Sequence, residues 1–247
     1  MTRAICIANQ KGGVGKTTTA INLASAIARS GQKTLVIDLD PQCNATTAMG
    51  HRPAETHALV KNDAIRHHVL ASAEENLSLL PGSRRFQDID LLAKSENSEA
   101  SQMVEHLNQG TKGFDCVLID CPPSLGQLTR TALSACDEVL MPIQCEYFAM
   151  EGLTQMIEVI RDVMSTSQGR LQFGGILLTM YDHTLELTSE VDNEVREFFG
   201  EIVFETVIPR DVSISEAPSH GKSVMDYSPR SRGSRAYIEL CMEVLER

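Results

Sequence analysis

The sequence predicts an α/β fold, a doubly wound and mostly parallel sheet of about seven to eight strands flanked by helices. Short apolar runs alternate along the chain with longer amphipathic stretches, which is the pattern of strand–helix–strand units. Several of the runs are apolar without interruption, as expected for strands that helices cover on both faces. The first run leads directly into a glycine-rich turn and a helix-like stretch, which predicts a phosphate-binding loop on this sheet.

The expected strands are the apolar runs, and the expected helices are the amphipathic stretches between them. The strands are Ala4–Ala8, Thr34–Asp38, Leu77–Leu80, Cys116–Asp120, Glu138–Pro142, Gly175–Met180 and Val203–Val207. The helices are Thr17–Arg29, Leu125–Ala135, Met150–Met164, Ser189–Phe199 and Arg235–Leu245. Residues 50–75 and 93–112 carry the weakest pattern, so we expect peripheral helices and loops there. Because no repeat or linker composition divides the chain, we expect one domain over residues 1–247.

Length and composition exclude several classes of protein. With 247 residues and 42% hydrophobic content, the chain can bury one large core, which argues against disorder. No apolar run approaches the roughly 20 residues that a membrane-spanning helix needs. A strand is expected almost at the first residue, which leaves no room for a signal peptide. The seven cysteines form no CxxC pair, so we expect reduced core thiols in a cytoplasmic protein.

Charge is distributed unevenly along the chain. The net charge is −11, which argues against a surface that is basic all over. Residues 209–235 nevertheless carry five basic and three acidic side chains. We therefore expect a small basic patch on an acidic body. The basic residues of this segment are Arg210, Lys222, Arg230, Arg232 and Arg235.

The glycine-rich turn predicts a cradle for the phosphates of a nucleotide. Glycine has no Cβ, so successive backbone N–H groups can converge on one anion, and the following helix adds its N-terminal donors. Lys16 is placed to reach the β- and γ-phosphates, and the hydroxyl group of Thr17 is placed to hold Mg²⁺. The predicted loop residues are Lys11, Gly12, Gly13, Val14, Gly15, Lys16, Thr17 and Thr18.

This loop departs from the usual G-x-x-x-x-G-K-[ST] spacing. Gln10 stands where the first glycine would be, and Lys11 adds a second cation. One interpretation is a solvated surface lysine. The other is a charge aimed at a phosphate that a neighbouring subunit holds, because the loop already has Lys16 for its own phosphates.

Two further strands are expected to end in carboxylates at the edge that carries the loop. Asp38 and Asp40 close one apolar run, and Asp120 closes another. Asp40 is a candidate to orient a water for attack on the γ-phosphate, and Asp38 is a candidate for the water shell of the metal. Either aspartate could instead cap the next helix. Asp120 is the expected second contact of the metal.

The segment Val207–Asp211 ends the last expected strand at the same edge. Pro209 and Asp211 are candidates to frame the adenine of the nucleotide. Arg210, between them, could equally be a surface charge.

Taken together, these motifs resemble the ParA/Soj family of partitioning ATPases, within the wider group that includes MinD. The resemblance spans nearly the whole chain and is specific because several motifs match together. They are KGGVGKTTTAINLA, VIDLDPQCNAT, VLIDCPPSLG, QCEYFAMEGL and VIPRDVSISEAPSHGKSV. The likeness is to the compact chromosomal type, in which no DNA-binding domain precedes the loop.

The resemblance implies an ATP-dependent homodimer in which two subunits sandwich two ATP molecules. Lys11 of each subunit would reach the phosphates of the other, and Gly12 would lie at the close contact between subunits. Lys16 and Thr17 would bind phosphate and Mg²⁺. Asp40 would assist hydrolysis and lie near the metal, and Asp120 would support the metal.

The resemblance further implies that the ATP-bound dimer binds DNA without sequence preference and associates with the nucleoid. A ParB-like protein or another cargo adaptor would stimulate slow hydrolysis, so that a chromosome origin, a plasmid or a protein assembly is positioned. Pairing doubles the basic patch, and counterion release at DNA phosphates then strengthens binding. The candidate phosphate contacts, each of which could instead be a solvated side chain, are Lys222, Arg230, Arg232 and Arg235.

The chain departs from the family pattern in two places. Cys43 stands where members commonly carry glycine, and an acidic stretch from Glu186 to Glu194 follows a turn where many carry a basic residue. An alternative is a MinD-like ATPase at a membrane surface, which needs a basic amphipathic helix. The terminal stretch Ser234–Arg247 carries more acidic than basic side chains, so we expect a docked last helix and no membrane partner.

Overall fold

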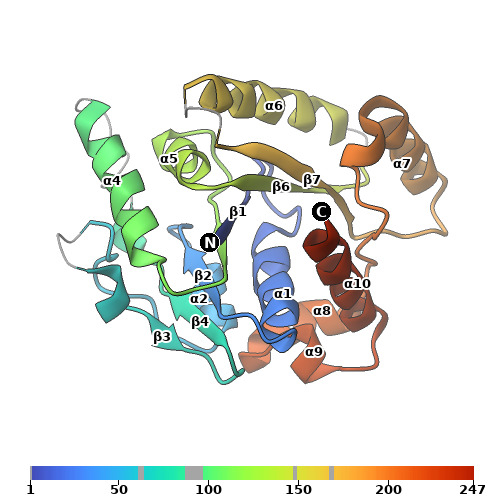
Figure 1. The fold of residues 1–247 in the computed structure, drawn as a ribbon. Coiled ribbons are helices and arrows are strands. Elements are labelled where there is room, and N and C mark those ends of the chain that lie inside the picture. The colour runs from blue at the N-terminus through green and yellow to red at the C-terminus, as the bar shows by residue number, and fades with distance from the viewer. Residues whose placement is uncertain (1, 61–63, 87–96, 147–148, 167–169) are drawn as a thin grey trace.

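The computed structural model describes residues 2–247 except 61–63, 87–96, 147–148 and 167–169. Its centre is a seven-stranded sheet with the strand order β3-β4-β2-β5-β1-β6-β7 (Figure 1). Neighbouring strands run parallel except for β3, which pairs antiparallel with β4 at one edge. The predicted doubly wound, mostly parallel α/β fold is confirmed.

Apart from the two-residue edge strand β3, the strands are largely buried, as their apolar sequences require. They are β1 (Arg3–Ile7), β2 (Thr34–Asp38), β3 (Leu70–Ala71), β4 (Leu77–Leu80), β5 (Cys116–Asp120), β6 (Glu138–Gln144) and β7 (Gln172–Thr179).

Helices cover both faces of the sheet. The α-helices are α1 (Lys16–Arg29), α2 (Asn44–Ala48), α4 (Asn97–Gly110), α5 (Gln127–Ala135), α6 (Ala149–Thr166), α7 (Glu186–Phe199), α8 (Val212–Glu216), α9 (Val224–Tyr227) and α10 (Arg232–Glu246). Short 3-10 turns are η1 (Ile65–His67), η2 (Arg84–Phe86), η3 (Gly200–Ile202) and η4 (Ala217–His220).

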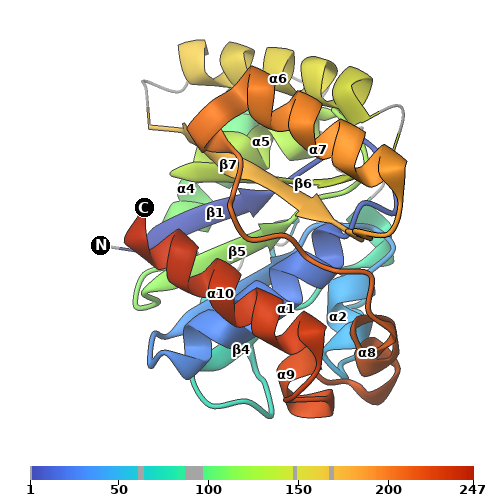
Figure 2. The same ribbon diagram turned by 90° about the vertical axis from the view of Figure 1, so that its right-hand side faces the viewer.

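The apolar core forms two layers, one on each side of the sheet. The layer under α5, α6 and α7 includes Leu133, Met156 and Val195. The layer under α1 and α10 includes Leu23 and Leu240. Figure 2 shows α6 and α7 on one side of the strands and α10 crossing over α1 on the other. Both faces of the central strands are therefore shielded from solvent, which explains their continuous apolar runs.

Strand register brings the predicted functional residues to one edge of the sheet. Asp38 pairs with Asp120 across β2 and β5, and Asp120 pairs with Ile7 across β5 and β1. The chain leaves all three strands at this edge, because they run parallel. The glycine-rich loop and the two predicted carboxylate segments are thus neighbours.

The prediction of a strand at Val203–Val207 is wrong. This segment lies beside β7 and makes a bridge between Val203 and Ile176, but it does not form a continuous ladder. The carboxylate of Glu243, on α10, accepts the N–H groups of Glu205 and Thr206 at 2.9 and 3.0 Å. Because a helix side chain takes these donors, an apolar run that would suit a strand stays irregular.

The other differences are smaller. The ends of the predicted helices and strands move by up to three residues. The helices α2, α8 and α9 have four or five residues each, too few for a helical repeat of apolar residues to be visible in the sequence. Peripheral helices and loops are predicted for residues 50–75 and 93–112. The structure describes η1 and α4 there, together with the short edge strand β3, which the prediction did not include.

All seven cysteines are buried free thiols, as predicted. The Sγ atoms of Cys6 on β1 and Cys121 after β5 lie 3.2 Å apart as a hydrogen-bonded pair. Among the helices of the described residues, none has the length and apolar content needed to cross a lipid bilayer.

We expect Glu243→Ala to lower the free energy of unfolding by about 1–3 kcal/mol, because two backbone N–H groups lose their acceptor. Burial opposes ionisation, but the N–H groups of Thr206 and Glu205 outweigh it and lower the pKa of Glu243 from 4.5. Its contribution is therefore present above about pH 4.5 and is lost as the pH falls through the lowered folded value. Urea denaturation at several pH values measures this.

Glu239→Ala, at an exposed position of the same helix, is the matched control and should cost little at any pH. An equal loss in both variants, or a loss for Glu243→Ala that does not diminish as the pH falls below 4.5, would contradict the assignment.

Candidate functional site

The glycine-rich loop connects β1 to α1, and its backbone is held in place by the protein. Gly13 and Gly15 have φ angles of 79° and 90°, in the left-handed region where other residues are strained. The hydroxyl group of Thr179, at the end of β7, lies 2.9 Å from the carbonyl oxygen of Val14. The N-terminus of α1 begins directly after Gly15, so its free N–H groups face the same space.

The side chain of Lys16 folds back across the loop. Its ammonium group donates a hydrogen bond to the carbonyl oxygen of Lys11 at 2.9 Å, and the residue is only 6% exposed. Burial lowers the pKa of Lys16, while the carboxylates of Asp120 and Asp40 act in the opposite direction. An anion in the loop would compensate this buried cation, which is the role that a nucleotide phosphate can fill.

Thr17 and Asp120 meet beneath the loop. The Thr17 hydroxyl donates a hydrogen bond to Oδ2 of Asp120 at 2.7 Å. Oδ1 of Asp120 is buried and accepts no hydrogen bond within the described structure. Burial, followed by the charge of Asp38, raises the pKa of Asp120 well above 3.8. A buried carboxylate oxygen without a donor is a site for a cation.

These residues fit a magnesium ion. Mg²⁺ prefers oxygen ligands, keeps several waters, and is held in nucleotide sites by one or two protein groups together with phosphates. The hydroxyl of Thr17 and the carboxylate of Asp120 are such a pair of oxygen donors at the start of α1. Bound there, the ion would neutralise phosphate charge and the buried carboxylate together.

Asp40 and Asp38 have different surroundings, although they are two residues apart. Asp40 is 6% exposed, and its Oδ1 accepts the N–H of Gln42 at 2.8 Å. Asp38 is fully buried and accepts hydrogen bonds from Thr46 in α2. Burial raises the pKa of Asp38 to about 6, although the bonds from Thr46 and Asp40 oppose the rise. Of the two roles considered for Asp38, the geometry favours the helix cap over the water shell of the metal.

Lys11 does not fold into its own loop. Its ammonium group forms an ion pair with Glu146, which follows β6, at 2.6 Å. Neighbouring Gly12 faces open space, because a Cβ built there would meet no atom within 4 Å. Whether Lys11 reaches the phosphates of another subunit therefore stays a prediction.

A pocket of about 250 Å³ lies beside the loop. Gly15 and Thr18 line it together with Pro209, Asp211 and Tyr237. The structure thus brings Pro209 to the loop, as the adenine hypothesis requires. The carboxylate of Asp211 is already engaged, because it accepts the N–H groups of Ser213 and Gly233, both at 2.9 Å. Asp211 thereby fixes the starts of α8 and α10. It helps to shape the wall of the pocket, while its carboxylate is already hydrogen-bonded within the protein.

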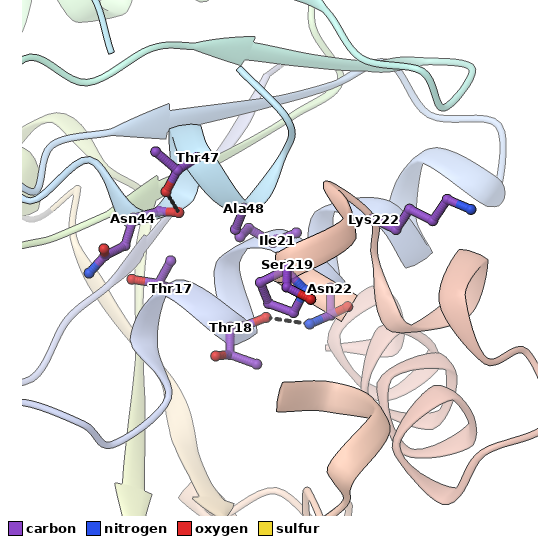
Figure 3. A pocket seen from close by; sticks show the side chains of 10 residues that line it. Thr17, Thr18, Ile21, Asn22, Asn44, Thr47, Ala48, Ser219 and Lys222 are labelled. Atoms are coloured by element: carbon purple, nitrogen blue, oxygen red, sulfur yellow. Dashed lines mark hydrogen bonds between the residues drawn. The ribbon is translucent and has the colours of Figure 1, made fainter. Parts of the chain in front are cut away.

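A second pocket, of about 430 Å³, is lined by residues of α1, α2 and η4 (Figure 3). Thr17 and Thr18 line it together with Asn44 from α2 and Ser219 from η4. In Figure 3 the side chain of Lys222 extends away from Thr17 and Thr18. Lys222 is therefore not directed at the phosphate loop.

The four predicted DNA contacts are all exposed, in the chain from η4 to the first turn of α10. Arg232 and Arg235 lie in that first turn, where a cation is unfavourable because the N-terminal end of a helix is positive. Arg232 donates a hydrogen bond to the carbonyl oxygen of Arg210 at 3.4 Å, so local helix stability leaves Arg235, rather than Arg232, without an explanation. Within the part of the chain that the structure describes, no ion pair engages either arginine. The four residues are Lys222, Arg230, Arg232 and Arg235.

Sequence reasoning did not identify three residues that shape the site. Glu146 forms an ion pair with Lys11, the hydroxyl group of Thr179 donates to the loop carbonyl of Val14, and Thr46 donates hydrogen bonds to the carboxylate of Asp38. The position of Thr179 at the carboxyl end of an expected strand was a usable signal, because such ends gather at the ligand edge. Glu146 and Thr46 lie inside the family motifs QCEYFAMEGL and VIDLDPQCNAT, but neither motif by itself specifies which group these side chains contact.

Comparison with known proteins agrees with this geometry. The model of the AAA_31 family, described as an AAA domain, matches residues 2–173. The sporulation initiation inhibitor protein Soj of Bacillus subtilis is 41% identical over 249 residues, covering 99% of this chain and 98% of that protein. The chromosome partitioning protein ParA of Caulobacter vibrioides NA1000 is 40% identical over 252 residues, covering 99% and 94% of the two chains.

A solved structure extends the comparison to bound ligands. The cobyrinic acid a,c-diamide synthase of Mycobacterium smegmatis, with bound ADP and magnesium, superposes with a TM-score of 0.87. It is 31% identical and the match covers 100% of this chain and 95% of that one. The ligands of this relative are those that the loop motif predicted.

The fold and the loop define a P-loop ATPase of the class that carries an additional lysine in its phosphate-binding loop. At about 40% identity over nearly its full length to several members, this chain belongs to the Soj/ParA family of chromosome-partitioning ATPases. The resemblance seen in the sequence motifs is confirmed.

We expect Asp120→Asn to stabilise the nucleotide-free protein at pH 7 by about 1–3 kcal/mol, because it removes a buried carboxylate charge that lies close to the charge of Asp38. The same change should abolish the part of the thermal stabilisation by ADP that requires Mg²⁺. Thermal unfolding with ADP, with and without Mg²⁺, measures both effects. Glu190→Gln, at an exposed position on α7, is the control. A Mg²⁺-dependent shift in Asp120→Asn as large as in the natural protein would contradict the assignment.

Proposed function

We propose that this protein is an ATPase that dimerises with ATP, binds DNA without sequence preference, and positions a chromosome origin, a plasmid or a protein assembly. A ParB-like or other adaptor protein stimulates its slow hydrolysis. One observation carries the proposal. Lys16, Thr17 and Asp120 are gathered around the loop, whereas the side chain of the second loop lysine, Lys11, is directed away from it and pairs with Glu146.

ATP and Mg²⁺ are the proposed ligands of this site. Lys16 and the N–H groups of the loop bind the phosphates, and the pocket beside Pro209 and Asp211 receives the adenine. Thr17 and Asp120 hold the metal, with Asp40 near it. The remaining phosphate-binding loop residues are Lys11, Gly12, Gly13, Val14, Gly15 and Thr18.

Asp40 is the proposed residue that orients the attacking water. Its carboxylate lies close enough to Lys16 to affect the pKa of that ammonium group, so it is near the phosphate end of the loop. A single positioned carboxylate supports slow turnover, which suits a protein whose ATP-bound state must persist.

Pairing of two subunits would complete the site. Lys11 is half-exposed and its partner Glu146 is half-exposed as well, so the ion pair contributes little to stability and can be exchanged. A triphosphate on a facing subunit offers Lys11 more negative charge than Glu146 does. Gly12, which faces open space, permits the close approach of the second loop.

Pairing would also create the DNA-binding surface. Each subunit offers a few exposed cations from η4 to α10, and two subunits double the number of phosphates that are contacted. Because each released counterion adds to the binding free energy, doubling the contacts changes affinity by orders of magnitude.

One observation favours a second candidate function, that of a MinD-like ATPase at a membrane surface. α10 exposes Ile238, Met242 and Leu245 along one side. The acidic side chains of Glu239 and Glu246 on the same helix oppose binding to anionic lipid.

A mobility shift with random-sequence DNA, compared with co-sedimentation on anionic vesicles, separates these functions. We expect a DNA shift that requires ATP and Mg²⁺ and no vesicle binding. Arg235→Glu should weaken DNA binding roughly tenfold or more at moderate salt, because a charge reversal removes a phosphate contact and adds a repulsion. Lys112→Glu is the matched control. Lys112 is also exposed, but it precedes β5 and so lies near the amino-terminal ends of the strands, away from the phosphate loop. Binding to vesicles and not to DNA would favour the second function.

We expect Asp40→Ala to retain binding of Mg²⁺-ATP and to lower turnover roughly a hundredfold or more, because the water loses its orienting carboxylate. The ATP-bound dimer should then persist, as measured by light scattering after size-exclusion chromatography. Turnover that stays unchanged, or a variant that remains monomeric with ATP, would count against this role.

A further inference from the structure

Asp38 is a buried carboxylate that the proposed hydrolysis does not use directly. It ends β2, two residues before Asp40, and its exposed fraction is 0%. Its Oδ2 accepts the N–H and the hydroxyl group of Thr46 at 2.8 and 2.6 Å, and its Oδ1 accepts the N–H of Asp40 at 3.2 Å. One carboxylate thus holds both ends of the segment from Asp40 to Thr46.

Thr46 extends this connection to a third element. Its hydroxyl donates to Asp38 and accepts the N–H of Gly82, which follows β4, at 2.8 Å. Like Asp38, Thr46 is fully buried. A single hydroxyl group therefore joins the end of β2, the helix α2 and the end of β4.

Gly82, the third residue of this connection, has no room for a side chain. A Cβ at Gly82 would lie 2.9 Å from Cγ of Asp38 and 3.0–3.1 Å from its two carboxylate oxygens. The backbone of Gly82 is not in the left-handed region, so the close approach of the carboxylate is what favours glycine here. Any larger residue would push the carboxylate away from Thr46.

The segment between the two ends is tightly folded. Asp40 accepts the N–H of Cys43 with its carbonyl oxygen and the N–H of Gln42 with its carboxylate, both at 2.8 Å. Cys43 has a φ of 56°, a conformation that costs a non-glycine residue on the order of 1–3 kcal/mol. Such a loop keeps its shape only when its ends are fixed, and Asp38 and Thr46 fix them.

We propose that Asp38, Thr46 and Gly82 form a tether that positions the carboxylate of Asp40 for hydrolysis. The three are positioning residues, which act through Asp40. The inference rests on the proposed role of Asp40. Phosphate binding belongs to the β1–α1 loop, so a loosened tether displaces Asp40 while the nucleotide stays bound. A displacement of about 1 Å can lower a rate roughly a hundredfold.

The variant that tests the tether is Thr46→Val, which removes the hydroxyl group and keeps the shape of the side chain. We expect kcat for ATP to fall roughly ten- to a hundredfold while KM for ATP changes less than about twofold. Thr46→Ser keeps the hydroxyl group and should restore kcat to within about threefold of the natural value. A purely structural role predicts instead that kcat follows the loss of Tm in both variants.

Thr34→Val is the matched control. Thr34 is also fully buried and its hydroxyl bonds a carbonyl oxygen, but it lies at the opposite end of β2. This variant should keep kcat within about twofold. Gly82→Ala provides a second test that removes no polar group; it should lower kcat as Thr46→Val does, because its methyl group displaces the Asp38 carboxylate.

Amide hydrogen exchange over residues 40–46 gives a readout that does not depend on activity. It should be at least about tenfold faster in Thr46→Val than in Thr34→Val. Unchanged exchange, or an unchanged kcat with loosened exchange, would overturn the tether. If the natural protein hydrolysed no ATP, the proposed function would fail. Amide exchange would still show whether Asp38 and Thr46 fix the segment 40–46. The proposed role in positioning Asp40 for hydrolysis would then be rejected together with the proposed function.

Discussion

The structure depends on three carboxylates that are buried at one edge of the sheet beside the buried ammonium group of Lys16. Asp38, Asp40 and Asp120 are each at most 6% exposed. Taking charges out of water is costly unless partners replace the lost hydration. The protein provides those partners only in part, and the places where it does not are the places where a ligand is expected.

Asp38 and Asp120 illustrate the difference. They are paired by register across β2 and β5, and both are fully buried. Asp38 accepts hydrogen bonds from three protein donors, so hydrogen bonds within the fold stabilise its negative charge. Asp120 receives one, from Thr17, and its second oxygen has none within the described structure. A satisfied buried carboxylate such as Asp38 can hold neighbouring segments in place, whereas an unsatisfied one beside a phosphate loop supports the proposal that Asp120 holds a metal.

The departures from the family pattern also acquire physical meaning. Cys43, where the family resemblance leads us to expect glycine, adopts a left-handed φ of 56°, which is the conformation that glycine suits best. The chain thus keeps the shape of the loop at some cost in strain. The acidic stretch on α7 lies on the opposite side of the sheet from α10 and its arginines (Figure 2). A DNA surface built from η4 to α10 therefore does not need to include α7.

The fold class, the phosphate loop and the carboxylates at the strand ends could all be predicted from the amino-acid sequence. Continuous apolar runs indicate buried strands, and glycines followed by Lys16 and Thr17 are a local chemical pattern. Tertiary contacts were needed to show that Val203–Val207 is not a strand, because Glu243, on a helix about forty residues away, accepts the N–H groups of Glu205 and Thr206. Tertiary contacts likewise determine that Asp38 accepts hydrogen bonds from Thr46 and that Lys11 forms an ion pair with Glu146. Those contacts join residues far apart in the chain, and nothing in the local pattern specifies which donor a buried carboxylate will find.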